Sequence, residues 1–249
     1  MALPPVETTP AYQRVARLLE AEIIAGRIAI GDLLPIEANL SAQLGVHRST
    51  IREGLRALES AGLLRRVKGK RLMVTAPDPH GAAWAGTRAI GLAGPRFLDL
   101  WEVQMQTEPF AAGLAATRCD STTLAALDAN LSRMADNLAD DDAIIAYDIE
   151  FHGLVAQATG NAALTLAVAP VNRLLFAATR DLFAALPQAR QRMLDAHHHI
   201  VAAIRAGDAY HAQDWMARHI RDFRRGYQVA GLPLDRVVGI EASVATFIA

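Results

Sequence analysis

The residues of this chain best suited to chemistry are histidines, some of which fall on the apolar face of a predicted helix. The run AHHHIVAAI, residues 196–204, holds three histidines in succession. His197 follows the three-to-four-residue spacing of the apolar side chains and is predicted to face inward. His199 lies on the opposite side and is predicted to face solvent, and His198 lies at the boundary. Only His197 is therefore a candidate for a role inside the protein.

Two further segments offer ligand-type side chains at helical spacing. Asp148 and His152 are four residues apart in AYDIEFHGL, and His219 lies on a partly apolar face in WMARHIRDF. One carboxylate and three imidazoles from three helices form a set that Zn²⁺ and Ni²⁺ accept, and helical bundles hold metal ions in this way. Two other interpretations stay open. An inward histidine can simply fill the core, and Asp148 can simply hydrogen bond to His152 along one helix.

The N-terminal part holds a third group of candidates, which is basic. Residues 1–76 contain 11 Lys and Arg against 7 Asp and Glu, whereas residues 77–249 contain 14 against 19. A basic head on an acidic remainder indicates binding to a polyanion. The pattern of residues 10–76 predicts a helix, two helices joined by a tight turn, and two short strands, which is the order of a winged helix-turn-helix. The candidate DNA contacts are His47, Arg48, Ser49, Thr50, Arg52, Lys68, Gly69 and Lys70.

Within this group, the side chains that would contact base edges in the major groove lie at the start of the second helix of the helix-turn-helix. Arg48 suits a bidentate contact to guanine, and Ser49, Thr50 and Arg52 suit phosphates or bases. The wing turn at residues 68–70 would reach the backbone or a neighbouring groove. The alternative is that Arg48 and Arg52, four residues apart, form an ordinary solvated helix face.

Composition divides the rest of the chain. Residues 77–97 contain three prolines and four glycines without a clear period and predict a linker, with or without a short helix. Residues 98–230 predict an antiparallel α-helical bundle with breaks near residues 120, 141, 160, 187 and 207. Residues 231–249 form a tail to which the sequence assigns no role. The predicted fold class is mostly α, with a winged helix-turn-helix joined to a helical bundle.

The 249 residues have the composition of a globular protein, with 52% hydrophobic and 20% charged residues. The single cysteine, Cys119, excludes a disulfide framework and fits the reducing cytoplasm. The first ten residues lack the basic and apolar regions of a signal peptide, and no stretch approaches the ~20 apolar residues of a membrane helix. We therefore expect a cytoplasmic protein without a membrane partner.

The segment LLPIEANLSAQLGVHRSTIREGLRALESAGLLRRVKGK resembles the winged-helix domain of the GntR family of bacterial transcription regulators. The resemblance covers residues 10–76 and implies binding to a double-stranded DNA operator, an inverted repeat read by a homodimer. Two positions depart from the family pattern. Ala38 stands where members usually carry a basic residue, and His47 stands where they usually carry a Ser or Thr that can cap the helix. The operator sequence of relatives therefore does not carry over.

Residues 98–225 resemble the FCD ligand-binding domain of the FadR branch of the same family. The matching patterns are D-xx-FH at 148–152, GN at 160–161, H-xx-I-xx-AI-xx-GD at 197–208 and M-xx-H at 216–219. The resemblance implies a divalent metal, Zn or Ni, because metal-containing members place their ligands at the positions of Asp148, His152, His197 and His219.

The same resemblance implies an effector pocket, for which Gln104, Glu108 and Asn161 are candidates. Relatives commonly carry an Arg four residues before the Glu, where this chain has Gln104. If that Arg holds an anionic effector in relatives, Gln104 weakens the expectation of the usual small carboxylate ligand. Gln104 can equally be a packing residue at a helix surface.

Together these patterns predict a homodimeric repressor whose operator affinity changes when a small molecule, such as an organic acid, binds at a metal site in the helical domain. The rival is a metal-dependent hydrolase in which three histidines and Asp148 hold Zn²⁺ and activate water. That chemistry needs a general base, and Glu150 lies off the face that Asp148 shares with His152. A hydrolase function leaves the basic N-terminal part unexplained. A third, weaker hypothesis is a winged-helix scaffold that binds other proteins. The sequence therefore predicts a regulator and no enzyme.

Overall fold

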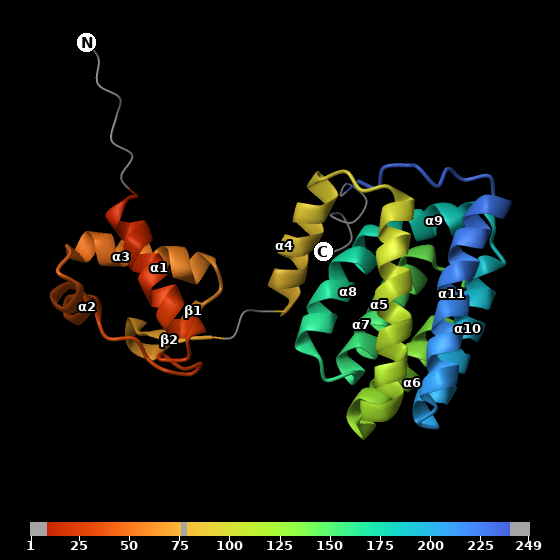
Figure 1. The fold of residues 1–249 in the computed structure, drawn as a ribbon, viewed down its shortest axis with the longest axis horizontal. Coiled ribbons are helices and arrows are strands. Elements are labelled where there is room, and N and C mark those ends of the chain that lie inside the picture. The colour runs from red at the N-terminus through yellow and green to blue at the C-terminus, as the bar shows by residue number, and fades with distance from the viewer. Residues whose placement is uncertain (1–8, 76–78, 240–249) are drawn as a thin grey trace, which may run out of the picture. The chain divides into compact units, whose positions relative to one another are not determined.

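The computed structural model describes residues 9–75 and 79–239, and the chain divides into two compact units, Met1–Gly81 and Ala82–Ala249 (Figure 1). Each unit has its own hydrophobic core. Nearly all regular structure in the described residues is helical, and their one sheet has two strands. The predicted fold class, a winged helix-turn-helix joined to an α-helical bundle, is confirmed.

The first unit consists of three helices followed by a two-stranded antiparallel sheet. α2 is followed by Gly45, whose φ of 64° is the left-handed conformation that glycine adopts without strain, so the chain turns sharply into the next helix. The strands pair in the register Leu64 to Val74, on either side of a short 3-10 turn. The elements are α1 (Ala11–Ile24), α2 (Glu37–Leu44), α3 (Arg48–Ser60), β1 (Leu64–Arg66), η1 (Lys68–Lys70) and β2 (Leu72–Val74).

α3 crosses α1 so closely that the crossing point has no room for a side chain. A Cβ built on Gly54 would lie 3.0 Å from the carbonyl oxygen of Tyr12 and 3.0 Å from Cγ1 of Val15. The apolar residues of α3 lie on this buried face. The opposite face of α3, with Arg48 and Ser49, is therefore left exposed.

The second unit is a bundle of helices whose boundaries are set by polar caps. The side chains of Asp120, Asp140, Asn161 and Asp208 accept hydrogen bonds from the first backbone N–H groups of the helices that follow them. α11 packs along α5 and α10, and α7 packs against α5, α6 and α8 (Figure 1). The helices are α4 (Pro79–Leu92), α5 (Phe97–Arg118), α6 (Ser121–Asp136), α7 (Asp141–Ala158), α8 (Ala162–Leu174), α9 (Phe176–Ala185), α10 (Ala189–Arg205) and α11 (Ala209–Val229).

The stretch predicted as a linker with or without a short helix, residues 77–97, contains the helix α4, which takes up residues 79–92. Small residues let this helix approach α8 closely, because a Cβ on Gly86 would lie 2.9 Å from Cγ of Pro170. Ala83 and Thr87 are buried in the same helix. Gly86, one of the glycines that suggested a loop, therefore serves as a packing position.

The first part of the tail packs on the bundle. The backbone N–H groups of Phe97 and Leu98, at the start of α5, donate to the carbonyl oxygens of Arg236 and Leu234 at 2.9 and 3.1 Å. The N–H of Val238 donates to Pro95 O at 2.8 Å. The bonds from Phe97 and Leu98 satisfy N–H groups that a helix start leaves without an intrahelical partner. Residues 240–249 of the predicted tail lie outside the described residues.

In the part of the chain that the structure describes, no single helix combines the length and the apolar composition that crossing a membrane requires. α8 and α9 meet these criteria only together, as a pair bent by 45°.

Candidate metal centre and DNA-binding surface

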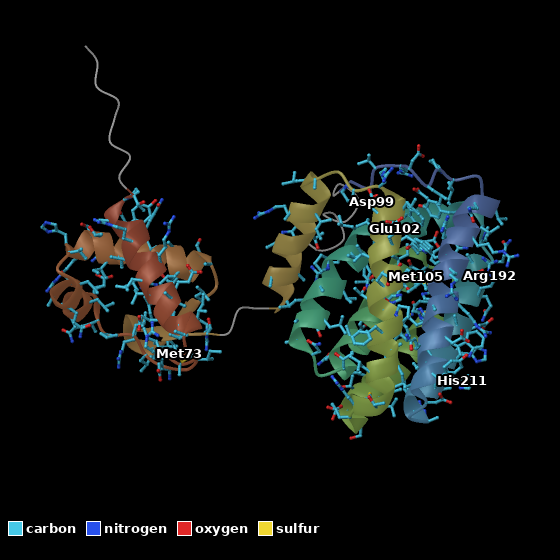
Figure 2. All side chains as sticks on the ribbon, in the orientation of Figure 1. Met73, Asp99, Glu102, Met105, Arg192 and His211 are labelled. Carbon is cyan, nitrogen blue, oxygen red and sulfur yellow. The ribbon has the colours of Figure 1, made fainter. Side chains whose placement is uncertain are left out.

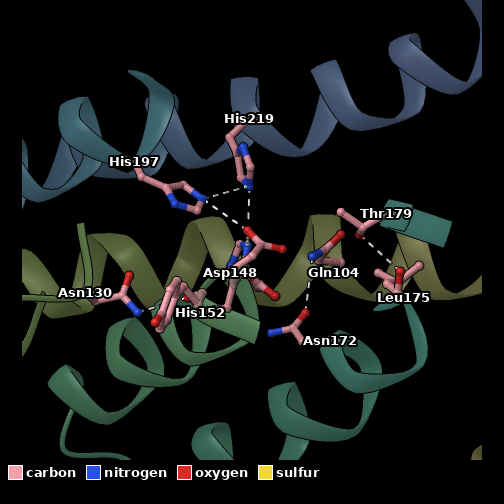
Figure 3. A network of polar contacts seen from close by, with 11 residues as sticks. Gln104, Asn130, Asp148, His152, Asn172, Leu175, Thr179, His197 and His219 are labelled. Atoms are coloured by element: carbon pink, nitrogen blue, oxygen red, sulfur yellow. Dashed lines mark hydrogen bonds and ion pairs between the residues drawn. The ribbon is translucent and has the colours of Figure 1, made fainter. Parts of the chain in front are cut away.

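Three helices bring the four candidate metal ligands together inside the second unit. Asp148 and His152 come from α7, His197 from α10 and His219 from α11, and the four side chains point toward one another (Figure 3). The turn at Gly207, where φ is 70°, makes α10 and α11 antiparallel neighbours. Two consecutive helices thus supply two imidazoles, and α7 supplies the other two ligands from adjacent turns.

The distances among the ligand atoms match those of a coordination sphere. Nε2 of His219 lies 3.4 Å from Nε2 of His197 and 3.3 Å from Nε2 of His152. Oδ1 of Asp148 lies 3.5 Å from Nε2 of His152 and 3.4 Å from Nε2 of His197. Ligand atoms bound at zinc–nitrogen distances around a tetrahedral ion are about 3.3 Å apart. The four ligand atoms all lie within 4.8 Å of one another, which fits a single metal ion.

Neighbouring residues fix the orientation of two of the rings. The carboxylate of Glu108, from α5, contacts Nδ1 of His152, which leaves Nε2 free for a metal. The ring of Phe151 stacks on His197 at 3.7 Å between centroids, with 9° between the ring planes. Glu108 was predicted to line an effector pocket, and the structure instead puts it behind a metal ligand. Its spacing from Gln104 gave no signal of this contact, because the partner lies on another helix.

Burial and charge separate the protonation states of the three histidines. Burial lowers the pKa of His152, but the carboxylates of Glu108 and Asp148 outweigh burial and raise that pKa to about 10. Burial and the neighbouring charge of His152 lower the pKa of His219 to about 4. Burial and the other imidazoles lower the pKa of His197 well below its usual range. The metal-free site thus holds two carboxylates and one imidazolium, whereas a divalent cation would balance both carboxylates.

A pocket of about 550 Å³, counted with its open mouth, adjoins the cluster. Asp148, His152 and His219 form part of its wall. Gln104 also lines it, buried rather than at a helix surface, with its amide nitrogen donating to Oδ1 of Asn172 at 3.2 Å (Figure 3). The rest of the wall is mostly apolar: Leu175, Thr179, Leu182, Phe183, Ala189, Met193, Ile220, Asp222 and Phe223.

Other candidates lie apart from this site. Asn161 is exposed and does not line the pocket, because its side-chain oxygen caps α8 at the N–H groups of Ala163 and Leu164. His199 is exposed on α10, as the helical spacing predicted, and its ring stacks on Trp215 at 3.9 Å between centroids. His198, which the spacing placed at the boundary, is also exposed.

His211 is also separate from the cluster. It projects from the start of α11 beside Asp208, with Nδ1 2.7 Å from Oδ2 of that residue (Figure 2).

The candidate DNA contacts of the first unit form an exposed surface. His47 occupies the N-cap position of α3 without a capping side-chain bond, and Arg48 and Ser49 are exposed in the first turn. Arg52 is exposed and forms an ion pair with Glu37 at 2.8 Å.

The remaining contacts are less exposed or lie on the wing. Thr50 is half-buried. At the tip of the wing, Lys68 is exposed and Gly69 has a φ of 80°. The side chain of Lys70 lies outside the described residues.

Comparisons with known proteins identify both units. The model described as "Bacterial regulatory proteins, gntR family" matches residues 11–74, and the FCD domain model matches residues 99–222. The chain belongs to the GntR family of bacterial regulatory proteins. This GntR-family regulator carries an FCD domain as its helical unit, which fits the FadR-like branch.

The regulator is similar to two named proteins of Escherichia coli. It is 28% identical to the Glc operon transcriptional activator over 245 residues, 88% of this chain and 89% of that protein. It is 29% identical to the Galactonate operon transcriptional repressor over 177 residues, 67% of this chain and 76% of that protein. The structure of Streptococcus agalactiae GntR matches with a TM-score of 0.63 and 26% identity over 86% of this chain and 99% of that one.

These matches decide between the two predicted functions. The matched families and the named relatives consist of transcription regulators rather than enzymes. The protein is therefore a ligand-responsive GntR-family transcription regulator, and the hydrolase alternative does not hold.

Proposed function

We propose that this regulator is a homodimeric repressor whose affinity for its operator is set by an organic acid bound at a metal centre in the FCD domain. The observation that carries the proposal is the convergence of four ligand atoms from three helices, all within 4.8 Å of one another and with four of their six separations at 3.3–3.5 Å. A buried cluster of this composition is costly without a cation, because two carboxylates then share one imidazolium.

The metal that this donor set fits is Zn²⁺ or Ni²⁺. Asp148, His152, His197 and His219 would hold it, and when bound it supplies open coordination positions for a carboxylate oxygen. Glu108 would keep His152 in the tautomer that presents Nε2. The adjoining pocket would hold the remainder of the effector. One relative is named for the operon of galactonate, which is an organic acid.

At the other unit, the first turn of α3 would enter the major groove and the wing would approach the backbone. Exposed Arg48 and Ser49 would contact bases and phosphates, and Lys68 would contact phosphate. Two copies would read half-sites of an inverted repeat about one helical turn apart. Binding to chromosomal DNA would locate the protein in the cytoplasm. A relative named as a repressor supports repression, although another relative is named as an activator.

Regulation requires that the effector bind better to one of two arrangements of the dimer, because a ligand with equal affinity for both shifts nothing. The residues of the metal centre lie on α7, α10 and α11, so an effector that draws these helices together would change the packing of the whole bundle.

The experiment that tests this function measures metal and DNA binding in the same preparations. Untagged wild type, His197→Ala and the matched control His199→Ala are analysed by mass spectrometry for bound metal. Near-stoichiometric metal is expected in wild type and His199→Ala, and none in His197→Ala. Their affinity for an operator selected from random duplexes is then titrated with and without organic acids. Wild type without metal, or operator binding that no acid changes, would contradict the proposal.

A further inference from the structure

Two buried amides in the pocket wall leave one donor and one acceptor without a partner. Gln104 on α5 and Asn172 on α8 are only 6% and 5% exposed. One hydrogen bond of 3.2 Å joins them, from Nε2 of Gln104 to Oδ1 of Asn172. Oε1 of Gln104 and Nδ2 of Asn172 are buried and have no hydrogen-bond partner among the described residues. Buried polar atoms without a partner are costly, so these two point to a group that comes from outside the chain.

The unpaired atoms belong to the same cavity as the metal centre. Gln104 and Asn172 line the pocket together with Asp148, His152 and His219 (Figure 3). Along α5, Gln104 is four residues, a rise of about 6 Å, from Glu108, whose carboxylate contacts His152. A small molecule that reaches the metal with one end therefore has its next few atoms near the two amides.

The group that fits there is uncharged and both donates and accepts hydrogen bonds. A carboxylate only accepts and an ammonium only donates, whereas the hydroxyl of an organic ligand does both. This holds for either orientation of the two amides, because reversing both leaves one donor and one acceptor again.

The charges of the wall lead to the same conclusion. Among the described residues that line the pocket there is no Lys or Arg, and two are aspartates. Asp222 is held from outside the pocket by Arg192, with Nε 3.0 Å from Oδ2. A second anionic group on the ligand would find no cation near the amides, and its burial would be unfavourable.

We infer that the effector is a hydroxylated monocarboxylate, bound through its one carboxylate at the metal centre and through a hydroxyl at the Gln104–Asn172 amide pair. The inference rests on the proposed function, because it assumes that an acid binds at the metal. It assigns to the amide pair the selection of hydroxy acids against dicarboxylates.

The test is calorimetric titration of the metal-loaded full chain with acids matched in length. The six-carbon set is galactonate and gluconate, galactarate and glucarate, and hexanoate; the four-carbon set is 4-hydroxybutyrate, succinate and butyrate. In at least one set the hydroxylated monocarboxylate is expected to bind about tenfold or more tightly than both the dicarboxylate and the unsubstituted acid, as one buried hydrogen-bonded group would give. Dicarboxylates that bind as tightly or more tightly overturn the inference and leave the proposed function standing.

Variants of the two amides distinguish binding of the ligand's hydroxyl from a merely structural role in the pocket wall. Gln104→Leu and Asn172→Leu should lose the preference for the hydroxy acid about tenfold while hexanoate or butyrate binds as before. Gln104→Arg should move the preference toward the dicarboxylate, because it supplies a cation. Gln157→Leu, the same change at an exposed position of α7, is the matched control. An equal loss for all acids would overturn the inference. If no acid binds to metal-loaded wild type, the proposed function fails with it.

Discussion

Glu108 and His152 form a buried ion pair between α5 and α7, with the carboxylate on Nδ1 and the opposite ring nitrogen directed at the metal centre. Both side chains are nearly inaccessible, at 3% and 2% exposure. A carboxylate in this position fixes the ring, selects its tautomer and raises its basicity, so its effect reaches the metal through the imidazole.

Replacing Glu108 should therefore weaken metal binding although Glu108 is not a ligand. Glu108→Gln is expected to lower the affinity for Zn²⁺ about 10–100-fold, measured by competition with a chromophoric chelator. Glu102→Gln, on the exposed face of the same helix, is the control and should bind as wild type does. Equal affinities in the two variants would show that the ion pair does not act on the metal site.

Metal binding should release a proton. The pKa of His152 is raised to about 10, so at pH 7 its ring carries a proton on Nε2 that a metal must displace. The pKa values of His197 and His219 are lowered, so these rings bind without releasing protons near neutral pH. Metal affinity is therefore expected to rise about tenfold per pH unit between pH 6 and pH 8. Calorimetry in buffers of different ionisation enthalpy measures the number of protons released.

The same titration with Glu108→Gln provides the check. Removing one of the two carboxylates that raise the pKa of His152 should reduce the proton release and flatten the dependence on pH. A pH-independent affinity in wild type would contradict the assignment of the proton to His152.

Operator recognition should depend on Arg48 more than on Arg27, which is not among the candidate DNA contacts. Arg48→Ala is expected to cost about 1–3 kcal/mol of specific binding if its guanidinium reads a base. The control is Arg27→Ala, because Arg27 is paired with Glu22 at 2.6 Å, in the turn that follows α1. Anisotropy titrations at one fixed salt concentration measure both variants. Unchanged operator affinity in Arg48→Ala would remove that residue from the base-reading set.

Replacement of glycine by alanine should have opposite effects on stability at Gly54, where α1 and α3 cross, and at Gly153, inside α7. Gly54→Ala should destabilise the first unit by about 1–3 kcal/mol, because the new Cβ has atoms of Tyr12 and Val15 at 3.0 Å. Gly153→Ala should stabilise the second unit by about 0.5–1 kcal/mol, because it lies inside α7 with no atom within 4 Å of its Cβ.

Denaturation can distinguish the two units because all three tryptophans, Trp84, Trp101 and Trp215, belong to the second. Gly54→Ala is expected to shift the unfolding curve measured by circular dichroism and to leave the tryptophan fluorescence curve in place. Gly153→Ala should shift the fluorescence curve toward higher denaturant. A fluorescence shift in Gly54→Ala would mean that the two units unfold together.

The sequence alone was sufficient to predict features that depend on residues within a single helix. The spacing of apolar residues separated His197 from its two exposed neighbours, and Asp120, Asp140 and Asp208 marked helix starts because a cap acts within a few residues. The same reasoning could have found the role of Asn161, which follows a glycine and precedes an apolar helix as a cap does.

Features that join separate helices were not predictable in this way. Glu108 meets His152 across α5 and α7, and Gln104 meets Asn172 across α5 and α8, and no spacing within one segment encodes such pairs. For a related reason, the sequence left open whether residues 77–97 contain a helix, which the structure has as α4. Its glycines weaken the helical pattern, and the close approach of Gly86 to Pro170 of α8 is visible only once the helices are packed.

The clasp between the start of α5 and residues 234–238 has a consequence for the order in which the protein is made. Synthesis on the ribosome delivers the winged module early, since its last strand ends at Val74. The bundle can be completed only late in synthesis, because α5 packs along α11. The first N–H groups of α5 also donate to the carbonyl oxygens of Leu234 and Arg236, which are made later still. Since domains fold as units during synthesis, each new chain should acquire its DNA-binding surface before it acquires the effector pocket that controls it.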